Sequence, residues 1–291
     1  MKLKNIFALK TTKAVSFISS AAIVLLAASA ANAASLNVLW YGNYNTKISE
    51  IADRASTFDP EGDGSLDWNL TIWNPQDPAP DFSDYDVLAI GTGWGLNFNP
   101  IFNNQEAISA ARGNRTFLSG QDADIHYNSR IVRPDGPFGF LVNAVNWAGS
   151  GEGMGIVSLP DGHSPKSQNW WLNDRSFLKN ELEGYVSYFP EQRVVIPTET
   201  SDFPVNEGLT TAGLSNWNTS AHAEFDKNIP GYLSINDAGS RLGYSVTIVT
   251  ASEADGSTDG AKTVPEPSSI LGLFALGGLG VRSLLKRKSQ L

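Results

Sequence analysis

Apolar and polar residues along the middle of the chain follow two different periods, and these separate strands from helices. Short apolar or alternating runs are typical of β-strands, whereas apolar positions spaced three and four residues apart are typical of helices. The first pattern predicts strands over residues 36–41, 68–73, 86–90, 115–119, 154–159, 193–196, 232–235 and 244–250. The second pattern predicts helices over residues 46–56, 101–112, 137–148 and 170–185.

The order of these elements predicts the fold class. Strands and helices alternate through most of the chain, and repeated β-α-β units place parallel strands in a sheet with helices on both faces. We therefore expect an α/β domain with a mostly parallel, flavodoxin-like sheet over residues 34–250. In such a sheet, ligands bind beyond the carboxyl ends of the strands.

The N-terminal segment has a pattern that is typical of a targeting signal. Four lysines precede a mostly apolar stretch over residues 14–28, and Ala31 and Ala33 form a small-x-small cleavage site. Residues 1–33 are therefore expected to be a signal peptide that is recognised by the Sec export machinery. An uncleaved membrane anchor is the alternative, and the Ala-Asn-Ala site argues against it.

The C-terminal segment over residues 264–291 has three parts. A Pro-Glu-Pro unit comes first and excludes a helix interior or a central strand. Residues 270–281 are apolar or small, and with Leu284 and Leu285 they predict a marginal transmembrane helix. A basic cluster follows, which the positive-inside bias keeps in the cytoplasm. The residues of this signal are Val264, Pro265, Glu266, Pro267, Arg282, Lys286, Arg287 and Lys288.

This order resembles the PEP-CTERM sorting signal of Gram-negative bacteria over residues 264–288. The resemblance implies processing by an exosortase-type enzyme and a precursor tethered to the inner membrane. The protein would then reach the cell envelope, the cell surface or the extracellular matrix. A C-terminal anchor that no enzyme processes is the alternative. Residues 251–263, rich in Ser, Asp, Gly and Ala, would form a linker.

Composition limits the partners and the chemistry of the exported part. Residues 34–263 contain 13 Lys and Arg against 29 Asp and Glu, a formal net charge of −16, which disfavours nucleic acid and anionic lipid. An extracellular polysaccharide remains a candidate partner. The chain has no cysteine, which excludes disulfides, thiolate ligands and cysteine nucleophiles. Of the eight tryptophans we expect most to lie in the core and some to form exposed stacking platforms for sugars.

A polar segment after the strand over residues 115–119 contains the first candidate site. If the chain stays extended there, the strand period places Asp122, Asp124 and His126 on one face. Carboxylates and imidazole are ligands that a divalent cation accepts, so these residues form a candidate metal site. The alternative is a polar strand end that hydrogen-bonds its own loop.

Two glycine-containing turns suggest a family. The turn Gly-Thr-Gly-Trp-Gly at residues 91–95 follows one strand, and Gly-Gln-Asp-Ala-Asp at residues 120–124 follows another. This arrangement resembles the class I glutamine amidotransferase-like fold, which includes ThuA-like domains. The resemblance implies oxyanion-binding N–H groups at the first turn and a nucleophilic cysteine at the second. Asp122 stands where that cysteine would be, which excludes the amidotransferase reaction.

Two further segments extend the resemblance. His222 and Glu224 are similar to the His-x-Glu pair of the family, although the usual proline between them is missing. Residues 203–209 are similar to a loop of ThuA-like proteins. His222 and Glu224 are therefore candidate catalytic residues. There is no P-loop and no Gly-x-Ser-x-Gly elbow, so nucleotide-dependent and serine-hydrolase chemistry lack their usual motifs.

Two other acidic segments carry weaker signals. Residues 59–67 place acids at positions 1, 3, 5 and 9 of an EF-hand-like loop, but Leu70 replaces the bidentate glutamate at position 12. This favours a solvated acidic loop over a weak calcium site. Asp161 and His163 flank a glycine after a strand, a pattern that is typical of a capped turn.

Two hypotheses from different classes follow. In the first, the protein is an exported, non-catalytic surface protein whose α/β domain binds a cation, a glycan or a small polar ligand near Asp122 and Trp94. In the second, it is a metal-assisted hydrolase of extracellular carbohydrate. The three predicted ligands would then hold a divalent cation that activates water, and His222 or Glu224 would transfer protons. The hydrolase requires all of these side chains to share one pocket.

Overall fold

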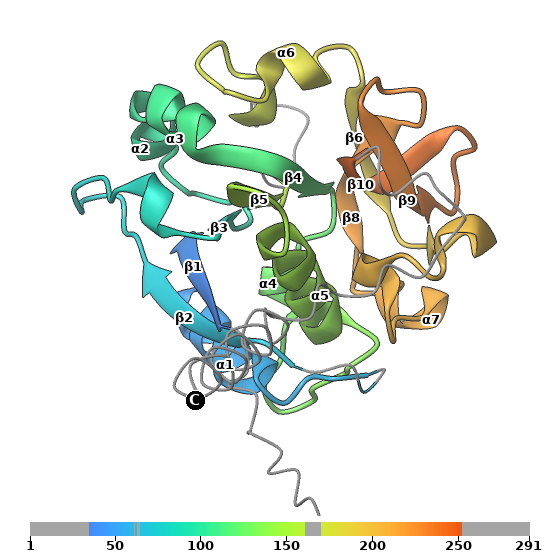
Figure 1. Ribbon diagram of the computed structural model, residues 1–291. Helices are drawn as coiled ribbons and strands as arrows, with labels where there is room; N and C mark the ends of the chain where they lie inside the picture. Colours follow the sequence, from blue (N-terminus) through green and yellow to red (C-terminus); the bar gives the residue numbers. More distant parts are fainter. Residues whose placement is uncertain (1–34, 61, 63–64, 161–169, 252–291) are drawn as a thin grey trace, which may run out of the picture.

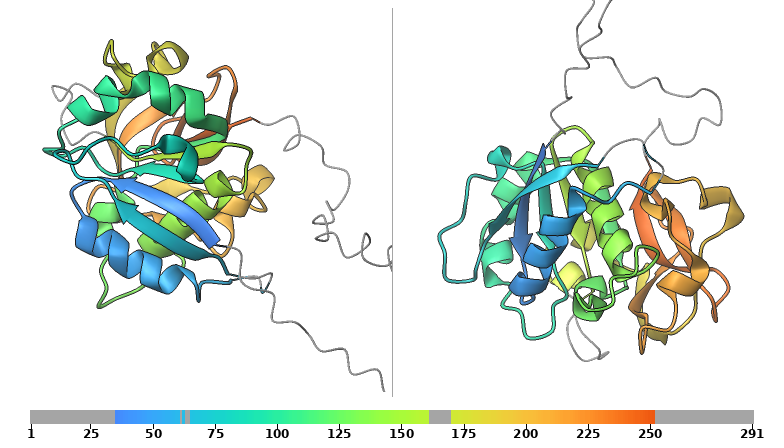
Figure 2. Two further views of the ribbon diagram at one scale, coloured as in Figure 1. Left: turned by 60° about the vertical axis from the view of Figure 1, so that its left-hand side comes forward. Right: turned by 90° about the horizontal axis from the view of Figure 1, so that it is seen from below.

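The computed structural model describes residues 35–60, 62, 65–160 and 170–251. In this part of the chain, ten strands form one mixed sheet with helices on both faces (Figures 1 and 2). The predicted signal peptide, the linker beyond residue 251 and the predicted C-terminal helix lie outside the described residues. Among the helices that are described, none has the length and hydropathy needed to span a membrane.

The strands are β1 (Ser35–Tyr41), β2 (Asp67–Ile72), β3 (Val87–Ile90), β4 (Arg112–Ser119), β5 (Met154–Ser158), β6 (Val186–Glu191), β7 (Val194–Val195), β8 (Ala221–Asp226), β9 (Tyr232–Ala238) and β10 (Tyr244–Thr250). The helices are α1 (Asn45–Ala55), α2 (Asn99–Asn103), α3 (Gln105–Ala111), α4 (Ala123–His126), α5 (Pro137–Gly149), α6 (Lys179–Leu182) and α7 (Thr211–Leu214). The strand predictions for β1, β2, β3, β5, β7 and β10 and the helix predictions for α1 and α5 are confirmed within two residues.

The strand order is β2-β1-β3-β5-β4-β10-β8-β6, with β9 paired to β10 and β7 paired to β9. The five strands from β2 to β4 are parallel, and every pairing of β10, β8, β6, β9 and β7 is antiparallel. The α/β class is thus confirmed, but a mostly parallel sheet is wrong. Residues 239–243 join β9 to β10, a connection too short for parallel pairing. Because β10 also borders β4 and β8, it changes the sheet from parallel to antiparallel.

The helix predicted over residues 170–185 is wrong. This stretch contains a 3-10 turn over Trp170–Leu172 and the four-residue helix α6. The side chains of Asn173 and Ser176 each accept a hydrogen bond from the backbone N–H two residues further on, at 3.0 and 3.2 Å. Such local bonds offer the backbone an alternative to the helical pattern.

The helix predicted over residues 101–112 is interrupted. Asn104 lies between α2 and α3, and its side-chain amide donates to the carbonyl of Pro100 at 2.8 Å. Arg112 already belongs to β4. The strands β6 and β8 have no counterpart in the prediction, because their buried positions include charged and polar side chains.

The core divides into two layers, one on each face of the sheet. Val38 and Trp40 of β1 pack with α1 and α5, whereas Leu39 and Tyr41 pack on the opposite face with residues of α2 and α3. Figure 2 shows these helices on opposite sides of the parallel strands. Seven of the eight tryptophans are buried, but the side chain of Trp94 is 60% exposed. Trp94 is thus the exposed tryptophan of the chain.

Candidate functional site

The carboxyl end of β4 lies unusually close to β8, and Gly120 makes this possible. The Gly120 N–H donates to Val246 at 2.7 Å, and its carbonyl accepts from the N–H of His222 at 2.7 Å. A Cβ at position 120 would stand 1.9 Å from the carbonyl oxygen of Ala223. Only glycine therefore allows the approach that brings Asp122 and His222 together.

The chain after Gly120 is helical and not extended, which corrects the expected geometry of the candidate metal ligands. Residues 123–126 form α4, and the His126 N–H donates to the Asp122 carbonyl at 3.2 Å. A separation of four residues places the side chains of Asp122 and His126 on the same face of a helical turn. Asp124 lies elsewhere on that turn and has different partners.

Asp122 lies between the two histidines. Its Oδ2 is 3.1 Å from Nε2 of His222, and its Oδ1 is 3.3 Å from Nε2 of His126. The Asp122 side chain is completely buried. The contact with His126 has the length of an ion pair but not the geometry of a hydrogen bond, so Oδ1 has no hydrogen-bond donor among the described residues.

The protonation state of Asp122 follows from these contacts. Burial by itself raises the pKa of this carboxyl, but the contacts with His126 and His222 outweigh it and hold the pKa below its usual value. Asp122 is therefore ionised at neutral pH. The site contains a buried negative charge with one oxygen that can accept a further hydrogen bond.

Asp124 supports the glycine turn. Its carboxylate accepts hydrogen bonds from the backbone N–H and the hydroxyl of Thr92, at 2.9 and 2.5 Å, and from the N–H of Ile125 at 3.0 Å. Complete burial raises the pKa of Asp124 to about 6. Asn43 donates to the carbonyl of Trp94 at 2.8 Å and fixes the same turn. Asp124 thus positions the turn that carries Trp94.

The expected three-ligand metal set does not assemble. Asp124 is bonded to Thr92, and the described residues contain no group of three His, Asp or Glu side chains that could hold a metal ion. Asp122 and His126 remain together, and His222 joins them from β8. His222 is separated from Asp122 by 100 residues, so only the family resemblance had linked it to the same candidate site.

A pocket of about 410 Å³ opens at this point, beyond the carboxyl end of β4. Its lining comes from the glycine turn, α4, β6, β8 and the segment before β8. The lining residues are Trp94, Asp122, Ile125, His126, Tyr188, Pro190, Asn218, Thr219 and His222. Four of the six side chains that the hydrolase hypothesis and the binding hypothesis named thus line one pocket. Asp124 and Glu224 do not.

The segment before β8 has strained backbone where it lines the pocket. Asn218 has φ 67° and Thr219 has φ 91°, a conformation that a β-branched residue rarely adopts. Gln192 holds this segment, because its side chain accepts from the Thr219 N–H at 2.9 Å and donates to the Thr219 hydroxyl at 3.2 Å. Backbone strain of this kind clusters at ligand sites. No sequence pattern had indicated that Asn218 and Thr219 line a pocket.

Glu224 lies near the pocket but outside its lining. Its Oε2 accepts a hydrogen bond from Arg241 at 2.6 Å, and its side chain is completely buried. Burial raises the pKa of Glu224 to about 7, although the charge of Arg241 opposes this effect. Glu224 is therefore a buried carboxyl that titrates near neutral pH.

The two weaker acidic segments lie partly or wholly outside the described residues. Positions 61, 63 and 64 of the EF-hand-like loop are not described, and the Gly62 N–H donates to Oδ1 of Asp59 at 2.8 Å. The predicted turn with Asp161 and His163 also lies outside the described residues.

Comparison with known proteins identifies the C-terminal segment. Residues 263–288 match the PEP-CTERM protein-sorting motif, which confirms the expected sorting signal. No curated protein and no solved structure matches the chain, so the resemblance of the α/β domain to amidotransferase-like proteins stays a prediction. The motif indicates an exported protein that an exosortase sorts to the cell envelope and surface.

Proposed function

We propose that the α/β domain of this exported protein is a non-catalytic binding module for a carbohydrate. The observation that carries the proposal is Asp122, an ionised and completely buried carboxylate at the floor of a 410 Å³ pocket, whose Oδ1 has no hydrogen-bond donor among the described residues. Oδ1 lies 3.3 Å from the imidazole of His126 but accepts no well-formed hydrogen bond, and a ligand hydroxyl would donate one to it.

The rim of the pocket supports a sugar as the ligand. Trp94 is 60% exposed beside a polar floor, although large apolar side chains are usually buried. An aromatic face beside hydrogen-bonding groups suits a sugar ring, which has an apolar face and a polar edge. Trp94 lies on a turn that hydrogen bonds with Asp124 and Asn43 hold in place. The position of its indole ring is therefore fixed.

Calorimetry on the full-length chain would test the proposal, with methyl glycosides of the common hexoses as probes in a detergent that has no sugar headgroup. We expect the wild type to bind at least one glycoside. Trp94→Ala should weaken binding roughly fivefold, since an aromatic contact contributes about 1 kcal/mol. Leu242→Ala is the matched control, because Leu242 is fully exposed away from the pocket lining. Absence of binding to every glycoside, or wild-type affinity in Trp94→Ala, would refute the proposal.

Asp124 and Glu224 lie outside the pocket lining, so the three-ligand metal hydrolase is not proposed. Hydrolysis of an extracellular glycoside that uses Asp122 and His222 alone is a second candidate, favoured by the contact between these two side chains. An imidazole oriented by a carboxylate is the arrangement of a general base. Release of the aglycone from a bound 4-nitrophenyl glycoside, with and without added divalent cations, would detect this activity. Loss of that release in His222→Gln with unchanged binding would favour the hydrolase over the binding module.

A further inference from the structure

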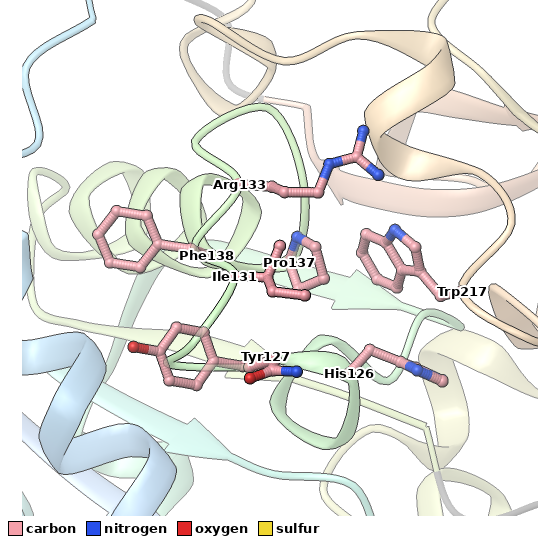
Figure 3. Close-up of a pocket in the computed structure, with 8 residues that line it drawn as sticks. His126, Tyr127, Ile131, Arg133, Pro137, Phe138 and Trp217 are labelled. Atoms are coloured by element: carbon pink, nitrogen blue, oxygen red, sulfur yellow. The ribbon is translucent and has the colours of Figure 1, made fainter.

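A second cavity adjoins the carbohydrate pocket and differs from it in chemistry. It has a volume of about 190 Å³ and lies between α4, the start of α5 and the segment before β8. Figure 3 shows Trp217 and His126 on one side of this cavity and Tyr127 and Phe138 on the other. Ile131 and Pro137 also line it. Most of its wall is therefore apolar or aromatic.

His126 belongs to both cavities. Its Nε2 lies 3.3 Å from the Asp122 carboxylate, on the side of the carbohydrate pocket. Its ring also contacts Trp217 of the second cavity, with ring centroids 5.9 Å apart. A ligand that filled both cavities would thus pass along one imidazole ring, with a polar part near Asp122 and an apolar part near Trp217.

The size of the second cavity suits a single ring. An apolar cavity of about 150 Å³ is large enough to bind benzene. Tyr127 and Trp217 are nearly buried, so their faces are fixed, whereas the side chain of Ile131 is 67% exposed. An exposed isoleucine beside buried aromatic residues is the part of the wall that a bound ring would cover.

A charged side chain in the wall of the second cavity favours certain substituents on the bound ring. Arg133 is the charged side chain in the lining, and it is half exposed with Asp135 3.6 Å away. Such a weakly held guanidinium can also bind an acceptor or an anion on the ligand. A ring with a nitro, phenolate or carboxylate substituent would place that group near Arg133.

We propose that this second cavity is a subsite for an aromatic ring joined to the carbohydrate, so that the preferred ligand is an aryl glycoside. The proposal deepens the proposed function and rests on it for the sugar half of the ligand. The ring half rests on the second cavity alone and can be tested without any sugar.

The first test compares ligands on the full-length protein. 4-Nitrophenyl glycosides should bind at least tenfold more tightly than the methyl glycosides of the same sugars, with a detergent-only titration as the blank. Equal affinity of the two series would overturn the aryl subsite and leave the carbohydrate pocket intact. Binding of neither series would overturn the aryl glycoside as ligand together with the proposed function.

The second test uses benzoate alone, which carries a ring and an anionic group but no sugar. We expect the wild type to bind benzoate and Ile131→Trp, which fills the cavity from its exposed edge, to lose that binding. Ile131→Trp should keep the affinity for methyl glycosides, and Leu242→Trp, at a fully exposed position, is the control for an added surface indole. Failure of the wild type to bind benzoate, or equal binding by Ile131→Trp, would overturn the subsite.

Discussion

Glu224 makes the stability of the domain depend on pH in an unusual direction. Burial raises its pKa from 4.5 to about 7, so the folded protein holds this proton at pH values where the unfolded chain has released it. Between pH 4.5 and pH 7 the folded state binds more protons than the unfolded state. The contribution of Glu224 to stability is therefore present at low pH and is lost as the pH rises through 7.

The magnitude follows from the size of the pKa change. Each tenfold change in proton affinity corresponds to about 1.4 kcal/mol, so the full change is roughly 3 kcal/mol. From pH 5 to pH 8 the wild type should lose about 2 to 3 kcal/mol of unfolding free energy through Glu224 alone. Glu224→Gln resembles the protonated carboxyl and keeps an acceptor for Arg241, so it should remove this part of the dependence.

Urea denaturation at pH 5, 6, 7 and 8 would measure the effect. The unfolding free energies of wild type and Glu224→Gln should be similar at pH 5, and the variant should become the more stable protein by about 2 kcal/mol at pH 8. Glu106→Gln, at an exposed position of α3, is the matched control and should not change the slope. A difference between wild type and Glu224→Gln that stays constant from pH 5 to pH 8 would refute the reasoning.

Three further predictions test other parts of the structure. Gly120→Ala should destabilise the domain by about 2 kcal/mol or more and separate β4 from β8, because the added Cβ would lie 1.9 Å from a backbone carbonyl oxygen. Thermal denaturation measures this loss, and an unchanged melting temperature would contradict the prediction. Arg112→Met should lower the unfolding free energy, measured by urea denaturation, by about 1 to 3 kcal/mol, because it removes the two hydrogen bonds to Glu181 at 2.6 and 2.9 Å. Adding Glu181→Gln to Arg112→Met should then have little further effect. Deleting residues 263–288 should release the protein, untethered, into the periplasm or medium, as judged by cell fractionation, and an unchanged location would contradict sorting by this segment.

The candidate site combines local sequence features with long-range contacts. The strand prediction for residues 115–119 placed Asp122 at a strand end, and the polar cluster after it was recognised. The geometry of this cluster was not predicted, because a polar segment of five residues is too short for its alternation to distinguish an extended chain from a helical turn. The bond between Asp124 and Thr92, 32 residues away, is a long-range contact that no local pattern contains. Tyr188 and Thr219 also line the pocket because long-range contacts bring their segments there.

The sequence by itself determined the features that depend on neighbouring residues. Hydrophobic periodicity identified β1, β2, β3, β5, β7, β10, α1 and α5. The order of a Pro-Glu-Pro unit, an apolar run and a basic cluster identified the sorting signal. Only the tertiary structure decided that the strands after β5 pair antiparallel and that Asp122 contacts His222. Periodicity shows which face of an element is buried, but not which distant element covers it. That choice depends on connection lengths and on close approaches such as the one Gly120 permits.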